Sequence, residues 1–127
     1  VDAINATANR GIRVGVHIIL GFPTESHDEL MRQAFLIGSF PITTLKLHRL
    51  QVIKGTKMAL EYERMPWKMP EVEEYIQLVK DYTSQLPSSI LLERFVSSSP
   101  AELLVAPRWG LKNHEFTNLL RKYGFDC

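Results

Sequence analysis

Three polar side chains interrupt two apolar segments of this sequence, and their types and spacing are the ones best suited to chemistry. His17 lies in the segment RVGVHIILG, and Lys46 and His48 lie in the segment TLKLHRL. An imidazole changes its charge near neutral pH, and a lysine carries a positive charge. If both segments are strands, alternation places His17 beside Ile19 on one side of the first strand. It places Lys46, His48, Leu50 and Val52 on one side of the second.

Two interpretations of this polar side follow from the residues. Charged groups are seldom fully buried without partners, so an inward-facing Lys46 and two histidines would indicate a polar interior that holds a ligand. An open sheet face in water, with His48 as a hydrogen-bonded core histidine, explains the same pattern. The residues by themselves favour the open face, and a functional interior needs further support.

The elements that must position these side chains form a strand, a helix and a second strand. Residues 13–21 are rich in Val and Ile and end at Gly21-Phe22-Pro23, where a strand must stop. A helix is expected near 26–38, followed by a second strand over 43–53. Ligands of such βαβ units collect at the carboxyl ends of the strands, here residues 21–25 and 50–52.

The rest of the chain continues this alternation. The pattern predicts, in order, the last turns of a helix over 1–11, a short helical or irregular piece through Tyr62, a helix over 71–86, a strand over 90–96, a turn of helix over 101–105 and a last helix over 114–123, capped by Asn113. This order predicts an α/β fold with a parallel sheet and crossover helices.

Composition describes a single ordinary globular domain, 1–127, with 45% hydrophobic and 23% charged residues. The formal net charge is +1, so nucleic acid and anionic membranes are not expected as partners of this segment. The only cysteine is Cys127, which fits a reducing compartment. No apolar run is long enough to span a membrane, and no leader indicates export, so we expect a cytoplasmic protein.

HIILGFPTE followed by KLHRLQVIKGT resembles the fifth and sixth strands of the radical S-adenosylmethionine (SAM) barrel. The likeness is greatest to an uncharacterised bacterial branch near the elongator-type and coproporphyrinogen-oxidase-like members. The segments EEYIQLV, LLERF and LLVAPRW resemble that branch as well, so the likeness covers most of the chain. It implies a partial (half) TIM-type barrel with parallel strands and a C-terminal helical closing segment.

The resemblance implies where SAM and a substrate would bind. The family motif Gly-x-Ile-x-Gly-x-x-Glu packs its apolar residue on adenine, which maps to Ile19, and its second Gly maps to Gly21. Glu25 stands one residue later than the motif acid, and His17 replaces the first Gly. Backbone groups over 50–52, including Leu50 and Val52, would flank adenine. The substrate candidates are His17, His48 and Arg94, and the catalytic candidates are His48 and Lys46.

In the family, three cysteines in the pattern Cys-x3-Cys-x2-Cys hold a 4Fe-4S cluster. SAM binds to this cluster and is cleaved to a 5′-deoxyadenosyl radical. One cysteine at position 127 cannot bind that cluster. We therefore expect a fragment of a longer enzyme that holds no metal and is inactive alone. Its expected partners are the missing N-terminal half and other copies that pair with exposed strand edges. The alternative is a small, non-catalytic α/β domain whose polar strand face binds a partner protein or a ligand.

Overall fold

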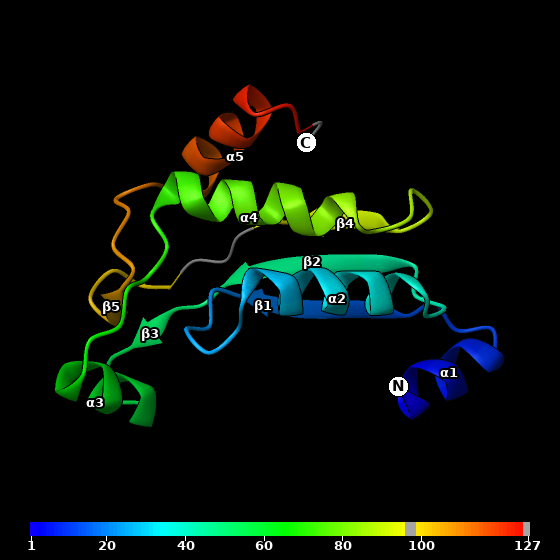
Figure 1. Ribbon diagram of the computed structural model, residues 1–127, viewed down its shortest axis with the longest axis horizontal. Helices are drawn as coiled ribbons and strands as arrows, with labels where there is room; N and C mark the ends of the chain where they lie inside the picture. The colour runs from blue at the N-terminus through cyan, green and yellow to red at the C-terminus, as the bar shows by residue number, and fades with distance from the viewer. Residues whose placement is uncertain (96–98, 126–127) are drawn as a thin grey trace.

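The computed structural model describes residues 1–95 and 99–125, with the exception of the side chain of Arg94. The elements, in chain order, are α1 (Asp2–Asn9), β1 (Gly15–Leu20), α2 (His27–Gly38), β2 (Thr44–Arg49), β3 (Val52–Ile53), α3 (Lys57–Arg64), α4 (Val72–Ser84), β4 (Leu91–Arg94), β5 (Leu104–Ala106) and α5 (Asn113–Lys122) (Figure 1). None of the helices in these two ranges reaches the length and hydrophobicity that crossing a bilayer requires.

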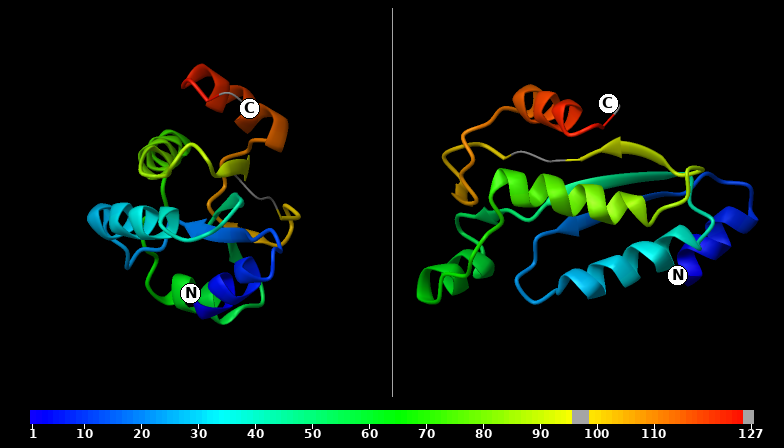
Figure 2. Two further views of the ribbon diagram at one scale, coloured as in Figure 1. Left: turned by 90° about the vertical axis from the view of Figure 1, so that its right-hand side faces the viewer. Right: turned by 45° about the horizontal axis from the view of Figure 1, so that its top comes forward.

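The main sheet has three parallel strands in the order β1-β2-β4. Helices α2 and α4 both lie on one side of this sheet, while β3, β5 and α3 lie beyond the carboxyl ends of β1 and β2 (Figures 1 and 2). The predicted mixed α/β fold with a parallel sheet is confirmed. The closure of this sheet into part of a barrel stays a prediction.

Local sequence explains why α2 begins where it does. The Ser26 hydroxyl accepts a hydrogen bond from the Glu29 N–H at 3.2 Å, and the Glu29 carboxylate accepts one from the Ser26 N–H at 3.0 Å. This reciprocal capping box satisfies two amides that the first turn leaves without helical partners. The start of the crossover helix is therefore determined by residues 26–29, which follow β1 closely in the sequence.

The core lies between the sheet and the two crossover helices, and we call it the helix-facing core. Leu20, Leu45 and Leu47 of the sheet are completely buried. They pack in one cluster with Leu30 and Ala34 of α2 and with four residues of α4: Tyr75, Ile76, Val79 and Tyr82. Burying a leucine side chain contributes about 1.5–3 kcal/mol, so this cluster is the main source of stability for the β1-α2-β2 unit.

The predicted strand over 43–53 is wrong as a single element. It divides into β2 and β3, because the chain leaves the main sheet after Arg49. The Leu50 N–H still donates to the Leu20 carbonyl at 2.8 Å, which holds the two strand ends together. Beyond that bond, Val52 and Ile53 pair in antiparallel fashion with β5.

The predicted turn of helix over 101–105 is also wrong in its second half. Leu104 starts β5, which pairs with β3, and both strands pack in a second small core that contains Leu50, Val52, Ala59, Met69 and Ala106. Leu104 and Ala106 are buried by this pairing. A contact with a segment some fifty residues away thus overrides the local helical preference.

The C-terminal helix α5 packs on α4 through aromatic side chains. Trp109 lies 5.3 Å from Tyr75 and 5.9 Å from Phe116, measured between ring centroids. The Trp109 indole N–H donates to the Pro70 carbonyl at 3.1 Å. The cap of α5 is Lys112 rather than the predicted Asn113, because the Glu115 carboxylate accepts the Lys112 N–H.

Candidate functional site

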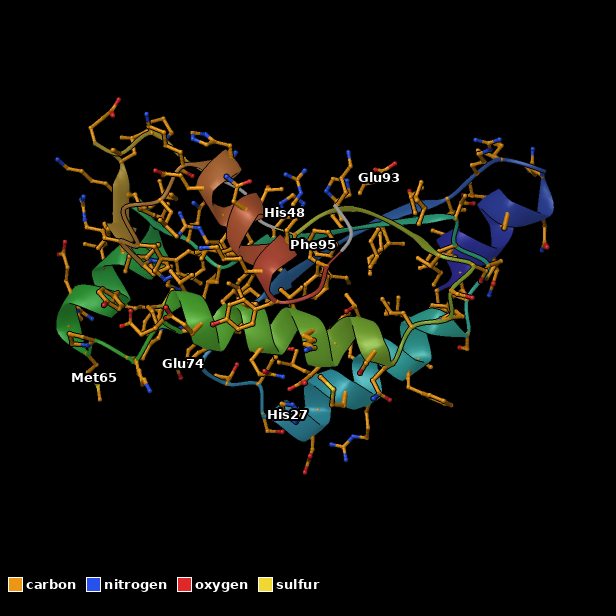
Figure 3. All side chains as sticks on the ribbon, turned by 90° about the horizontal axis from the view of Figure 1, so that it is seen from above. His27, His48, Met65, Glu74, Glu93 and Phe95 are labelled. Atoms are coloured by element: carbon orange, nitrogen blue, oxygen red, sulfur yellow. The ribbon has the colours of Figure 1, made fainter. Side chains whose placement is uncertain are left out.

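The open face of the main sheet carries the polar side chains that alternation predicts. Ile19 and His17 of β1 are exposed, whereas Leu20 is buried under the helices. In β2, Lys46 and His48 share the open face. Figure 3 shows His48 and Glu93 on the side of the sheet opposite the helices that carry His27 and Glu74.

His17 and His48 are brought together by the register of the two strands. Residue 17 pairs with Lys46, and Ile19 pairs with His48, so the two histidines are diagonal neighbours on one face. Their rings bridge this diagonal, with Nδ1 of His17 at 2.9 Å from Nε2 of His48. The strand register therefore brings two histidines into contact. Their place on the same face could be predicted from the sequence, but their contact could not.

Lys46 has an acidic partner on the next strand. Its ammonium lies 3.5 Å from the Glu93 carboxylate, and about a third of each side chain is exposed. Such a half-exposed pair contributes on the order of 0–1 kcal/mol to stability. The pair explains how the positive charge of Lys46 is compensated on the open face when no ligand is bound. The catalytic role predicted for Lys46 stays a prediction.

A cavity of about 410 Å³ lies at the carboxyl ends of β1 and β2, and we call it the carboxyl-end cavity. It is lined by His17, Ile19, His48, Arg49, Leu50, Gln51 and Ile53. Ile19, with 47% of its surface exposed, presents an apolar wall here. An apolar side chain in the wall of an open cavity fits one face of a flat ring such as adenine.

The other predicted adenine-contacting residues lie around this cavity in different ways. Gly21 has a φ of +109°, and an added Cβ would point at Leu50, so the turn itself requires glycine there. Leu50 lines the cavity and is otherwise buried. Val52 is completely buried in the second core, pairs with Ala106 of β5 and does not line the cavity. The expectation that Leu50 and Val52 continue the open face of β2 is wrong, because β2 ends at Arg49.

Glu25 is not brought into this cavity by the described contacts. The Glu25 N–H bonds to the Phe22 carbonyl in the turn before α2, and the Glu25 charge helps to raise the pKa of Tyr82, a tyrosine of the helix-facing core. Burial is the larger cause of that raised pKa. Arg94 ends β4, and its side chain lies outside the described part of the structure, as do Ser97 and Ser98. The binding roles of Glu25 and Arg94 stay predictions.

Sequence reasoning missed Arg49, and it included Gln51 only through the backbone of the range 50–52. The Arg49 guanidinium lies 4.4 Å from the centre of the Trp109 ring and donates to the Pro107 carbonyl at 3.2 Å. Burial lowers the pKa of Arg49, and the nearby Tyr75 opposes that shift. Gln51 accepts a hydrogen bond from the Ser99 hydroxyl at 2.7 Å. The sequence signal that could have identified Arg49 is its charge, because alternation places this residue on the side of β2 that is otherwise apolar.

The residues present fit the adenine part of SAM but not an iron-sulfur cluster. A 4Fe-4S cluster of this type needs three thiolates, and the sequence contains one cysteine. Within the described ranges, no group of three or more His, Cys, Asp or Glu side chains is placed to hold a metal ion. Any cluster ligands must therefore come from outside this chain.

Comparisons with known proteins agree with this picture. The chain is 31% identical over 122 residues to the uncharacterized protein YtqA of Bacillus subtilis, covering 96% of this chain and 38% of that protein. It is 33% identical over 129 residues to an uncharacterized protein of Methanocaldococcus jannaschii, covering 98% of this chain and 40% of that protein. The chain thus spans about two fifths of the length of these relatives.

A solved structure of Methanocaldococcus infernus Elp3 with an N-terminal deletion has the same fold over 99% of this chain and 31% of its own, with a TM-score of 0.74 and 23% identity. Residues 42–124 match the family described as Radical_SAM C-terminal domain, a match that begins after β1 and α2. The predicted radical SAM relationship is confirmed, and the chain belongs to the Radical_SAM C-terminal domain family.

Proposed function

We propose that this chain forms the adenine-binding and substrate-facing part of a radical SAM enzyme. The observation that carries the proposal is the carboxyl-end cavity, where the exposed Ile19 lies next to the Gly21 turn. Ligands of parallel α/β folds bind at this end of the strands. Membership of the family favours this function over a non-catalytic interaction domain.

In this proposal, Ile19 and Leu50 hold adenine between apolar side chains, and the backbone over 50–52 hydrogen-bonds its edge. Gly21 allows the turn that leaves the edge of the adenine ring accessible to this backbone. Glu25 lies just after that turn. His17, His48 and Lys46 face the substrate, and Arg94 is a further candidate for binding it. The remainder of the enzyme would hold the 4Fe-4S cluster, and SAM bound to that cluster would supply the radical chemistry for hydrogen abstraction.

The remainder of a longer protein is the partner that this proposal requires. Within the described residues, β1 and β4 are the edges of the main sheet, and each has one side without a neighbouring strand. An N-terminal half that adds strands at the β1 edge would extend the sheet toward a TIM-type barrel. A chain without that half should self-associate through its strand edges. The single cysteine fits a cytoplasmic enzyme.

The adenine contact is tested by Ile19→Asp in a longer protein that contains this chain. A carboxylate against adenine costs several kcal/mol of desolvation, so the Kd for SAM should rise by more than about tenfold. Leu91→Asp is the matched control, because Leu91 is an exposed apolar residue of β4 that does not line the cavity. Equal SAM affinities of the two variants, measured by equilibrium dialysis, would reject the proposed contact.

The need for a partner is tested on the 127-residue chain itself. Anaerobic reconstitution should leave it without a cluster and without SAM cleavage, because it contains one thiol. Iron and sulfide analysis checks the first outcome, and chromatography of 5′-deoxyadenosine checks the second. A stoichiometric 4Fe-4S cluster on this chain would contradict the proposal.

A further inference from the structure

The contact between His17 and His48 has the geometry of a shared proton. The two facing nitrogens are 2.9 Å apart, the ring centroids are 5.0 Å apart, and the ring planes differ by 14°. Because the facing nitrogens are much closer than the centroids, the rings meet edge to edge. An N–H on one ring therefore points at the lone pair on the other, which is the arrangement of an N–H···N hydrogen bond.

A bridging metal ion fits this geometry less well. Zinc–nitrogen bonds are about 2.0–2.1 Å long, and a tetrahedral ion would hold the two nitrogens roughly 3.4 Å apart, with both lone pairs directed at the ion. The observed nitrogens are closer and are directed at each other. No third metal-ligating side chain accompanies them within the described part of the chain. A shared proton accounts for the contact without a metal.

A hydrogen-bonded pair of neutral imidazoles has two tautomeric forms, which differ in the direction of the shared hydrogen bond. When Nδ1 of His17 donates to His48, Nε2 of His17 is a bare acceptor. When Nε2 of His48 donates instead, Nε2 of His17 carries the proton and can donate it. Passage from the first form to the second adds a proton at Nε2 of His17, moves the bridging proton to Nε2 of His48 and removes the proton from Nδ1 of His48. Uptake of a proton at one end of the pair thus changes His17 from an acceptor to a donor at the nitrogen that points away from His48.

The surroundings expose one ring of the pair to a ligand and shield the other. His17 is exposed and His48 is half-buried, and both line the carboxyl-end cavity. The nearest charges on this face are Lys46, which lies opposite His17 in register, and Glu93, which pairs with it. The Arg49 guanidinium lies against Trp109. A proton can therefore enter at His17 beside a lysine whose charge is already offset.

We propose that His17 and His48 act as one acid–base pair that exchanges a single proton with the substrate, an inference that rests on the proposed function. The ligand class is a molecule whose ionisable O–H or N–H group reaches Nε2 of His17 in the carboxyl-end cavity while adenine occupies Ile19. Its proton passes to Nε2 of His17, and the proton on Nδ1 of His17 passes to Nε2 of His48. The ligand is left as its anion, His48 carries the positive charge, and no electrons are transferred.

The shared proton is tested by nuclear magnetic resonance of the chain with isotope-labelled histidine. The ring nitrogens of His17 and His48 should report one proton between them, and His48→Ala should change the tautomer of His17. His114→Ala is the matched control, because this exposed histidine of α5 does not line the cavity. An unchanged His17 spectrum in His48→Ala, with two rings that titrate independently in the native chain, would overturn the proposal.

Proton exchange with a ligand is tested with para-nitrophenol, which has an apolar ring and an O–H whose ionisation changes its absorbance. His17→Ala and His48→Ala should reduce the formation of bound nitrophenolate by at least about tenfold, whereas His114→Ala should not. His48→Gln separates proton exchange from positioning, because an amide can hydrogen-bond to His17 but cannot carry the proton. Native-like nitrophenolate formation by His48→Gln would overturn the proposal.

The two proposals can fail separately. Absence of SAM binding to the longer protein, with intact proton sharing and nitrophenol ionisation, would reject the SAM function and leave the acid–base pair. Normal SAM binding with independent histidines would reject the pair and leave the SAM function.

Discussion

Leu47 and His48 are consecutive residues of β2 that lie on opposite faces of the main sheet. Leu47 is completely buried in the helix-facing core, whereas His48 bonds to His17 on the open face. One strand thus provides packing with one set of side chains and candidate chemistry with the other. Substitutions at alternate positions of β2 should therefore have separable effects on folding and on binding.

Leu47→Asp should unfold the protein or reduce its free energy of unfolding by at least about 3 kcal/mol. The new carboxylate would lie among apolar side chains without a partner. Ile19→Asp is the matched control, because its side chain is about half exposed on the open face and should change stability by less than about 1 kcal/mol. Urea unfolding of both variants checks this, and a similar loss in the two would contradict the assignment of faces.

Gly38→Ala should destabilise the protein although alanine favours helices. Gly38 ends α2, and an added Cβ would lie 2.8 Å from Cδ of Pro87, a ring that cannot easily move. Overpacking of this kind costs about 1–3 kcal/mol, which exceeds the gain of at most about 1 kcal/mol from helix propensity. Thermal unfolding of Gly38→Ala with and without Pro87→Ala measures the coupling. An increase in stability from Gly38→Ala alone would show that the contact is not tight.

The parts of the fold that the sequence predicts correctly depend on local patterns. The apolar alternation of β1 and the start of α2 near residue 26 are each specified within a few residues. The β3–β5 pair could not be predicted, because Val52 and Ala106 gain their partners from distant segments. The bond between His17 and His48 depends on the register of two strands, which the alternation of side chains does not determine.

Arg49→Met should loosen the attachment of the C-terminal segment to the sheet. The variant keeps the apolar stem but loses the cation over Trp109 and the bond to the Pro107 carbonyl, a loss of about 1–3 kcal/mol. Trp109 fluorescence in a Trp67→Phe background should shift toward the emission of a solvated indole. Arg49→Lys retains a charge without the planar fork and should give an intermediate shift. Unchanged emission in Arg49→Met would show that Arg49 does not hold Trp109 in place.

Alkaline pH should destabilise the protein through Tyr75 and Tyr82. Both side chains are completely buried, and burial raises the pKa of each hydroxyl above its ordinary value of about 10. The folded state therefore binds more protons than the unfolded state above about pH 10, so the stabilising contribution is complete below that pH and is lost as the pH rises toward the folded pKa values.

The measurement is the free energy of unfolding of the native protein and of the Tyr75→Phe/Tyr82→Phe variant between pH 8 and about 11. The variant lacks the hydroxyls that donate to the Phe95 carbonyl at 2.6 Å and to the Gln33 side chain at 2.9 Å, so it should be less stable near pH 8 by about 1 kcal/mol per lost bond. Above pH 10 the native protein should lose up to about 1.4 kcal/mol per pH unit for each tyrosine, a loss that the variant cannot show. Parallel pH profiles would mean that burial does not raise the pKa of either hydroxyl in the folded protein. Convergence of the two profiles as the pH rises is the expected outcome, because ionisation becomes possible only when the native chain unfolds and exposes these two groups to water.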